Sequence, residues 1–389
     1  SRYRLEKVIE TWGDMIPYIN YKAQIDKIPE TNQILREVGV NPENTSLVIS
    51  TLLKWVQENI EFNGTRGLSF ISKSSKATYD DRYGSNEDLA VLLMGMLKEA
   101  GIRVYPVLTR FYTNGKPVSS FPYPYQFDHI LVVAEVGFEK YYLDPSVSFA
   151  EVNEPYWKSQ NVEAVILKRN DIEIVTTPGS DYIENSSVGV HTISNIENNR
   201  IDIQTDIQYT GISLGFINSL KKNDDERKNE RVVNYIQDDL TTAVVDTFLI
   251  GDKSMSITYH SDGYALKTRD RIIINPNVFR RYEHSATWGD ERYSNFYYSY
   301  PYLIKDIYNI TIPKGYEVES LPTNYILEDK QTGLYFYYKT KVTDGSIIIT
   351  RERQTQKRVV ARGLFEKVNE YYSMLMASDN EEIILKRID

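Results

Sequence analysis

Three short stretches of the sequence place reactive side-chain types where the backbone would support chemistry. Ser85 and Asn86 begin an apolar stretch with helical periodicity, His129 opens an apolar run, and Asp144 closes another. A helix N-terminus favours negative charge, an imidazole can accept or release a proton, and a carboxylate can orient an imidazole. Taken singly, each residue also has an ordinary structural explanation as a helix cap, a polar strand end or a turn residue before proline.

The stretch 84–102 has the pattern of a helix with both ends marked. Ser85 and Asp88 have capping-box spacing, and Gly101 can adopt the left-handed conformation that ends a helix. Apolar residues recur at i, i+3, i+4, i+7 and i+8, and they are Leu89, Leu92, Leu93, Met96 and Leu97. This spacing predicts an amphipathic helix that packs one face against the core.

The two runs that carry the histidine and the aspartate have the pattern of strands. Residues 130–134 and 141–143 are apolar or aromatic, and the short connection between the two runs predicts an antiparallel pair. The loop before them contains Phe121-Pro122-Tyr123-Pro124-Tyr125. Two interpretations remain open: a stiff loop packed on its own domain, or a cleft wall that stacks on a ligand through Tyr123 and Tyr125.

The order of these segments resembles the transglutaminase-like branch of the papain-like thiol hydrolases. In the bacterial branch the helix usually opens as Gly-Asp-Cys-Lys-Asp-Lys-Ala, and the window here is Gly-Ser-Asn-Glu-Asp-Leu-Ala, residues 84–90. The His-Ile-Leu-Val segment at His129 and the Leu-Asp-Pro segment around Asp144 also match. Asn86 stands where the family has its nucleophilic cysteine.

The resemblance implies a degenerate triad made of Asn86, His129 and Asp144. A carboxamide cannot replace a thiolate as nucleophile, and the chain contains no cysteine. We therefore expect a catalytically inactive protein that binds a peptide, a glycan or a partner protein in the former cleft, with Tyr123, Tyr125 and Ser85 as ligand contacts. The alternatives are an envelope assembly module with a vestigial cleft, or a hydrolase that uses the Ser85 hydroxyl.

The second half of the chain changes to strands with one polar face. Residues 188–193, 201–209 and 256–260 alternate with period two. Helical patterns interrupt them at about 214–245 and return at 359–377, before a final strand at 382–386. This half resembles the β-sandwich that follows the transglutaminase-like domain in secreted Bacteroidetes proteins, which commonly carry a further β domain upstream.

The expected fold class is α+β, with a transglutaminase-like domain followed by a β-sandwich domain that contains helical insertions. The Pro-Gly segment near residue 178 is the best linker, so the expected domains are residues 1–178 and 179–389.

Composition narrows the functional classes. A net charge of −9 argues against nucleic-acid binding, and no apolar run approaches the roughly 20 residues of a membrane span. With no cysteine and four scattered histidines, neither a metal site nor a cofactor is expected. An absence of thiols fits an extracytoplasmic location, in the periplasm or at the cell surface, with the export signal outside this sequence.

Overall fold

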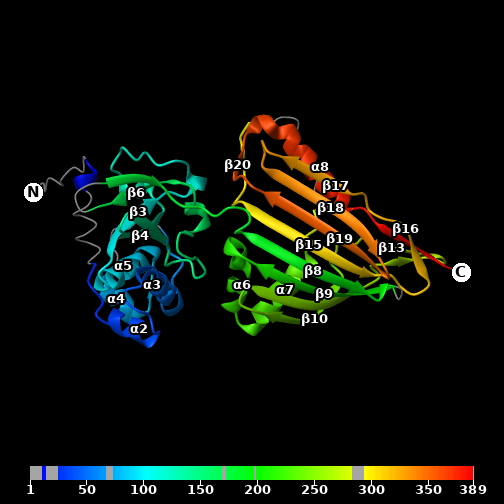
Figure 1. Cartoon of the computed structure of the whole chain (residues 1–389), viewed down its shortest axis with the longest axis horizontal. Helices are drawn as coiled ribbons and strands as arrows, with labels where there is room; N and C mark the ends of the chain where they lie inside the picture. The colour runs from blue at the N-terminus through cyan, green and yellow to red at the C-terminus, as the bar shows by residue number, and fades with distance from the viewer. Residues whose placement is uncertain are drawn as a thin grey trace, which may run out of the picture. The chain divides into compact units, whose positions relative to one another are not determined.

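The computed structural model of the chain describes residues 11–14, 25–66, 73–168, 172–196, 199–282 and 293–388. By their contacts, the residues divide into two compact units, residues 1–180 (unit 1) and 181–389 (unit 2) (Figure 1). Both units combine helices with β-sheets, so the fold is α+β, as the sequence predicts.

Unit 1 is built around helix α5 (Asn86–Glu99). The predicted capping box is present, because the Ser85 hydroxyl accepts from the Asp88 N–H and the Asp88 carboxylate accepts from the Ser85 N–H. Every residue from Asn86 to Leu97 is buried, so the helix is enclosed rather than amphipathic. It packs on three helices and on two strands of the unit 1 sheet (Figure 1). Those helices are α2 (Thr31–Glu37), α3 (Thr45–Asn59) and α4 (Ser75–Asp81).

The sheet of unit 1 is antiparallel and has five strands in the order β5-β4-β3-β6-β7. The strands are β3 (Arg103–Thr109), β4 (His129–Val136), β5 (Glu139–Leu143), β6 (Glu163–Leu167) and β7 (Ile172–Thr176). Along β4, Ile130 and Val132 belong to the core shared with the helices, whereas Leu131 and Val133 belong to a second apolar cluster. Successive side chains of a strand point to opposite faces, so both faces of β4 are buried, which explains its unbroken apolar sequence.

Unit 2 contains a large sheet of eight strands in the order β10-β11-β9-β8-β15-β19-β18-β17 (Figure 1). The pairing of β8 with β15 is parallel and the other pairings in this sheet are antiparallel. The strands are β8 (Ser186–Ser194), β9 (Arg200–Tyr209), β10 (Ala243–Ile250), β11 (Ser254–Asp262), β15 (Tyr302–Thr311), β17 (Tyr325–Asp329), β18 (Leu334–Thr343) and β19 (Ser346–Thr355).

The core of unit 2 lies on one face of this large sheet. Alternate residues of β9, such as Ile201, Ile203 and Ile207, are buried in it. The core also takes side chains from α6 (Leu214–Lys221), α7 (Asp225–Gln237), α8 (Phe365–Asp379) and the smaller sheet. The smaller sheet has the order β12-β13-β21-β16, and its strands are β12 (Leu266–Lys267), β13 (Arg271–Ile274), β16 (Tyr316–Ser320) and β21 (Ile383–Arg387).

Two expectations for unit 2 need correction. The helical insertion ends earlier than expected, since α7 ends at Gln237 and β10 begins at Ala243. The last helix begins at Phe365, and Val359–Val360 form the short strand β20, which pairs with β14 (Phe296–Tyr297). In both places a short apolar, β-branched stretch fits either periodicity. Strand pairing decides the outcome: β10 pairs with the next strand, β11, and β20 pairs with β14, about 60 residues earlier in the chain.

Within the described part of the chain, no helix combines the length and the apolar character that a membrane span requires.

A glycine in the middle of α5 allows the closest helix contact in this region. A Cβ built on Gly95 would lie 2.3 Å from the Asp26 carbonyl oxygen and 2.7 Å from the Ser75 hydroxyl, and Ser75 begins α4. Alanine is the better helix former by about 1 kcal/mol, yet here its methyl group has no space.

We predict that Gly95→Ala lowers the free energy of unfolding by about 2 kcal/mol, because overpacking outweighs helix propensity. Denaturant unfolding would measure the change. Gly363→Ala is the matched control, because a Cβ at Gly363 meets open space, and it should stay within about 0.5 kcal/mol of the parent protein. A stabilised Gly95→Ala protein would contradict the proposed close contact.

Candidate functional site

Asn86 is the first residue of α5 and its carboxamide is bonded to the backbone of β4. The side-chain oxygen accepts from the Ile130 N–H at 2.9 Å, and the side-chain nitrogen donates to the Ile130 carbonyl at 3.1 Å. The pairing of β4 with β5 ends at Val132 and Leu143. The N–H and C=O of Ile130 lie beyond that end, and the Asn86 side chain is their partner in place of a strand. The carboxamide, which has the donor and acceptor of a peptide group, therefore continues the hydrogen bonding of the sheet.

A second backbone connection brings the loop after α3 to the same place. Strand β1 (Glu61–Phe62) runs parallel to β2 (Tyr83–Gly84), immediately before α5. The pairing continues, because the Asn86 N–H donates to the Thr65 carbonyl at 3.0 Å. This contact fixes the next residue, Arg66, beside the N-terminus of α5.

Ser85 and Gly84 both act at the N-terminus of α5, where Ser85 is the cap residue and Gly84 packs against Asp88. A Cβ on Gly84 would lie 2.6 Å from the Cβ of Asp88, so only glycine fits there. The Asp88 carboxylate also accepts from the Lys73 N–H at 2.6 Å, which holds the approach to α4. The structure thus uses the Ser85 hydroxyl as a cap, and the ring nitrogens of His129 are bonded to other residues.

His129 and Asp144 form the hydrogen-bonded pair that the sequence predicts. The His129 Nε2 lies 2.7 Å from the Asp144 Oδ2. The other carboxylate oxygen accepts from the Ser146 hydroxyl at 2.7 Å and from the Ser146 N–H at 3.1 Å, and Oδ2 also accepts from the Tyr156 N–H at 2.9 Å. Asp144 is therefore held by four donors and cannot turn away from the ring.

Arg66 occupies the remaining nitrogen of His129. Its guanidinium donates to the His129 Nδ1 at 3.2 Å and to the Ser146 hydroxyl at 2.8 Å. The same guanidinium lies over the rings of Tyr156 and Phe62, at 4.2 and 4.6 Å from their centroids. Because an arginine can only donate, Nδ1 must be an acceptor, and the ring proton lies on Nε2, facing Asp144.

The charges of this cluster compensate one another. Burial by itself would raise the pKa of Asp144, but the interactions with His129, Arg66 and Ser146 outweigh burial and lower that pKa to about 2. Burial lowers the pKa of the Arg66 guanidinium, and the Asp144 carboxylate opposes this effect. An arginine keeps its charge in proteins, so Arg66 and Asp144 form a buried pair of opposite charges joined through the imidazole.

The three predicted triad positions lie together but have no solvent access. Asn86, His129 and Asp144 are each 0% exposed. The expected binding of a ligand in the former cleft would need solvent access at these positions. Arg66 and its contacts close the position instead. This residue lies in the polar loop after α3 and was not among the predicted site residues.

The two tyrosines predicted to form a cleft wall contact each other and are not the aromatic rings beside His129. Tyr123 and Tyr125 pack against each other with ring centroids 5.7 Å apart, and they are 49% and 62% exposed. The rings beside His129 are those of Phe111 and Tyr156, at 5.7 and 5.9 Å. A role of Tyr123 and Tyr125 in ligand binding stays a prediction.

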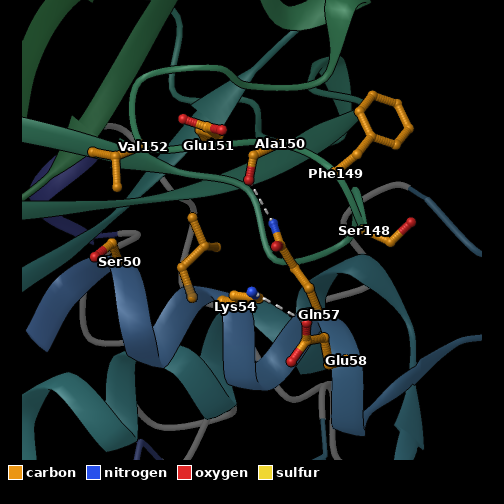
Figure 2. Close-up of a pocket in the computed structure, with 10 residues that line it drawn as sticks. Ser50, Lys54, Gln57, Glu58, Ser148, Phe149, Ala150, Glu151 and Val152 are labelled. Atoms are coloured by element: carbon orange, nitrogen blue, oxygen red, sulfur yellow. Dashed lines mark hydrogen bonds and ion pairs between the residues drawn. The ribbon is translucent and has the colours of Figure 1, made fainter. Parts of the chain in front are cut away.

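A hollow of about 480 Å³ lies beside the closed site, between α3 and residues 148–152 (Figure 2). Gln57 reaches across it from α3, and its side-chain nitrogen donates to the Ala150 carbonyl at 2.9 Å and to the Asp144 carbonyl at 3.2 Å. Gln57 thus connects the hollow to the backbone of Asp144, whose carboxylate is bonded to His129. Among the described residues, no group of three or more His, Cys, Asp or Glu side chains could hold a metal ion.

Comparison with known proteins finds a family model that matches part of unit 2 and a solved structure with a similar fold. Residues 270–385 match the model of a family described as a domain of unknown function with a solved structure, DUF3858. None of the curated proteins matches the sequence. A crystal structure of a "putative protease" from Parabacteroides distasonis is 11% identical with a TM-score of 0.58, and the match covers 97% of this chain and 59% of that chain. The two proteins share a fold.

The shared fold is compatible with a transglutaminase-like fold, which the sequence of unit 1 resembles. The chain spans only 59% of the length of the Parabacteroides protein. A "putative cysteine protease" from Cytophaga hutchinsonii is 16% identical over 43% of this chain and 57% of that chain, and its TM-score of 0.27 is too low to support an argument.

The lowered pKa of Asp144 predicts how stability depends on pH. A carboxyl with a pKa of 3.8 when unfolded and about 2 when folded stabilises the protein above pH 3.8, and this contribution disappears as the pH falls through about 2. The shift corresponds to about 2 kcal/mol. We predict that Asp144→Asn destabilises unit 1 at neutral pH and that the difference from the parent protein narrows as the pH falls.

Denaturant unfolding followed by tryptophan fluorescence would measure this, because three of the four tryptophans, Trp12, Trp55 and Trp157, belong to unit 1. A difference that stays constant from neutral pH down to pH ~2.5 would mean that the Asp144 carboxylate is not held in this way.

Proposed function

We propose that this chain is a non-catalytic protein with a transglutaminase-like domain, in which the former catalytic site serves as a buried structural centre. The observation that carries the proposal is the complete use of the His129 imidazole, with Nε2 bonded to Asp144 and Nδ1 to Arg66. A general base needs a free nitrogen within reach of the group that it deprotonates. Here that nitrogen accepts from a guanidinium.

The nucleophile position supports the same proposal. Asn86 has no ionisable proton, and both polar atoms of its side chain are bonded to Ile130. The chain has no cysteine that could substitute. The alternative nucleophile, the Ser85 hydroxyl, accepts from the Asp88 N–H in the helix cap. A hydrolase that uses Ser85 would have to break that cap and displace Arg66 from His129.

Of the two non-catalytic functions expected from the sequence, the closed site favours the structural one. Binding of a peptide, a glycan or a partner protein at the triad itself would require Arg66 to leave two hydrogen bonds and two aromatic rings. An assembly role at the cell envelope, with an extracytoplasmic location, is part of this proposal and rests on the resemblance and on the absence of cysteine. Ligand binding in unit 1 would use the hollow at Gln57.

A thiol placed at position 86 tests whether the site is closed. We predict that Asn86→Cys gives a protein that iodoacetamide labels at least ~100-fold more slowly than Ser120→Cys, because position 86 is buried and position 120 is exposed. Neither variant should hydrolyse thiol-protease substrates. Adding Arg66→Met, which keeps the packing and removes the donors, should accelerate labelling at position 86.

Circular dichroism would establish that each variant is folded. Rapid labelling of the single variant Asn86→Cys, together with peptide hydrolysis that His129→Ala abolishes, would show an open and competent site and would overturn the proposal.

A further inference from the structure

Unit 2 contains a separate cavity of about 480 Å³ with a composition unlike that of the hollow in unit 1. Its walls are mainly tyrosine rings and serine hydroxyls. Among the described residues that line it, Ile304 is the one aliphatic side chain, Arg280 is the one charged side chain, and none is acidic. A volume of this size suits a small ligand, of monosaccharide to disaccharide dimensions.

Arg280 is held in place by charged residues around its backbone. It has a φ of +55°, in the left-handed region that a residue with a Cβ seldom adopts. The Asp239 carboxylate accepts from the N–H groups of Arg280 and Arg281, and the Arg280 carbonyl accepts from Arg351 and Arg353. Residues held in rare conformations by their surroundings are concentrated at functional sites.

The guanidinium of Arg280 fixes the direction of two hydroxyl groups. One of its nitrogens donates to the Ser187 hydroxyl at 2.7 Å and to the Tyr235 hydroxyl at 2.9 Å. Each hydroxyl oxygen is therefore an acceptor toward Arg280, and its own proton is directed to a different acceptor. For Tyr235 the one protein hydroxyl in reach is that of Tyr209, a longer contact of 3.4 Å that also lies on the cavity wall. Tyr235 and Ser187 both line the cavity, so these polarised O–H groups suit an acceptor inside it.

The positive charge of Arg280 is only partly compensated. Among the described residues, the carboxylate that pairs with its guanidinium is that of Asp306, 3.7 Å away, which also interacts with His191 at 3.2 Å and with Arg351 at 3.5 Å. Burial raises the pKa of the cavity tyrosine Tyr209 above its ordinary value, so the phenol stays neutral. The cavity therefore combines neutral aromatic hydroxyls with one fixed cation.

We propose that this cavity binds a sugar acid, a pyranose that carries a carboxylate. Tyrosine rings offer apolar faces to the C–H groups of a sugar, and their hydroxyls can bond its hydroxyl groups. The carboxylate accepts from the Ser187 and Tyr235 hydroxyls, which Arg280 supports with its charge. A peptide carboxylate fits the cation but not a wall of hydroxyls and rings with one aliphatic side chain.

Calorimetric titration of the full chain with D-glucuronic acid, D-galacturonic acid, D-glucose and D-galactose tests this proposal, because each acid differs from its neutral partner only at C6. We expect at least one acid to bind ~10-fold or more tightly than its neutral partner, and the affinity to fall with added salt. Acetyl-diglycine, a peptide carboxylate without a sugar ring, should bind more weakly than that acid.

Variants that each lack one cavity hydroxyl test whether the ligand binds in this cavity. Tyr235→Phe and Ser187→Ala should each weaken binding of the acid about 10-fold while the melting temperature stays close to that of the parent protein. Tyr337→Phe removes a hydroxyl outside the cavity and should leave the affinity unchanged. Equal affinity for the acid and its neutral partner, preference for acetyl-diglycine, or no binding of either acid by the folded parent protein would overturn the proposal.

Discussion

The side-chain carboxamide of Asn86 connects the central helix of unit 1 to the sheet. Its two hydrogen bonds to the Ile130 backbone are buried, and both the helix start and the strand end lie where water does not reach. A buried N–H or C=O that loses its partner costs about 1–3 kcal/mol, so this one side chain satisfies two costly groups. A cysteine at the same position would be smaller and a weak hydrogen-bonding group, and it would leave the Ile130 groups poorly satisfied.

The cluster of Arg66, His129 and Asp144 depends on a second constraint, which is the compensation of buried charge. Asp144 can remain ionised in the interior because Arg66 lies close by and because four hydrogen bonds reach its oxygens. Removing either charged partner would leave the other uncompensated, which is far more costly than the interaction is stabilising. The imidazole of His129 lies between them and donates on one side while accepting on the other. His129 and Asp144 therefore have the geometry of an orienting imidazole–carboxylate pair, with a carboxamide beside them instead of an ionisable nucleophile.

Local sequence patterns predicted the elements of this site but not its closure. Capping residues and apolar periodicity act over a few neighbours, so the helix at 84–102 and the strands carrying His129 and Asp144 were accessible from sequence. The role of Arg66 was not accessible from sequence, because an arginine in a polar loop has no distinctive pattern. Its contact with His129 depends on the pairing of β1 with β2, which lie far apart in the chain. The predicted helical insertion likewise extended to about residue 245 and so included the first residues of β10 (Ala243–Ile250), whose pairing partners on β11 lie at Tyr259–Ser261.

The protonation pattern of the His129 ring would show whether Arg66 occupies its second nitrogen. The full chain has four histidines, and long-range proton–nitrogen correlation spectra of protein labelled with ¹⁵N-histidine distinguish a protonated from an unprotonated ring nitrogen. The signals of His129 would be those that disappear in His129→Gln. We expect a single neutral tautomer with the proton on Nε2, slow to exchange with water, and an unprotonated Nδ1. A ring protonated on Nδ1, or one whose proton exchanges rapidly with solvent, would contradict this expectation, because Arg66 could not then donate to that nitrogen.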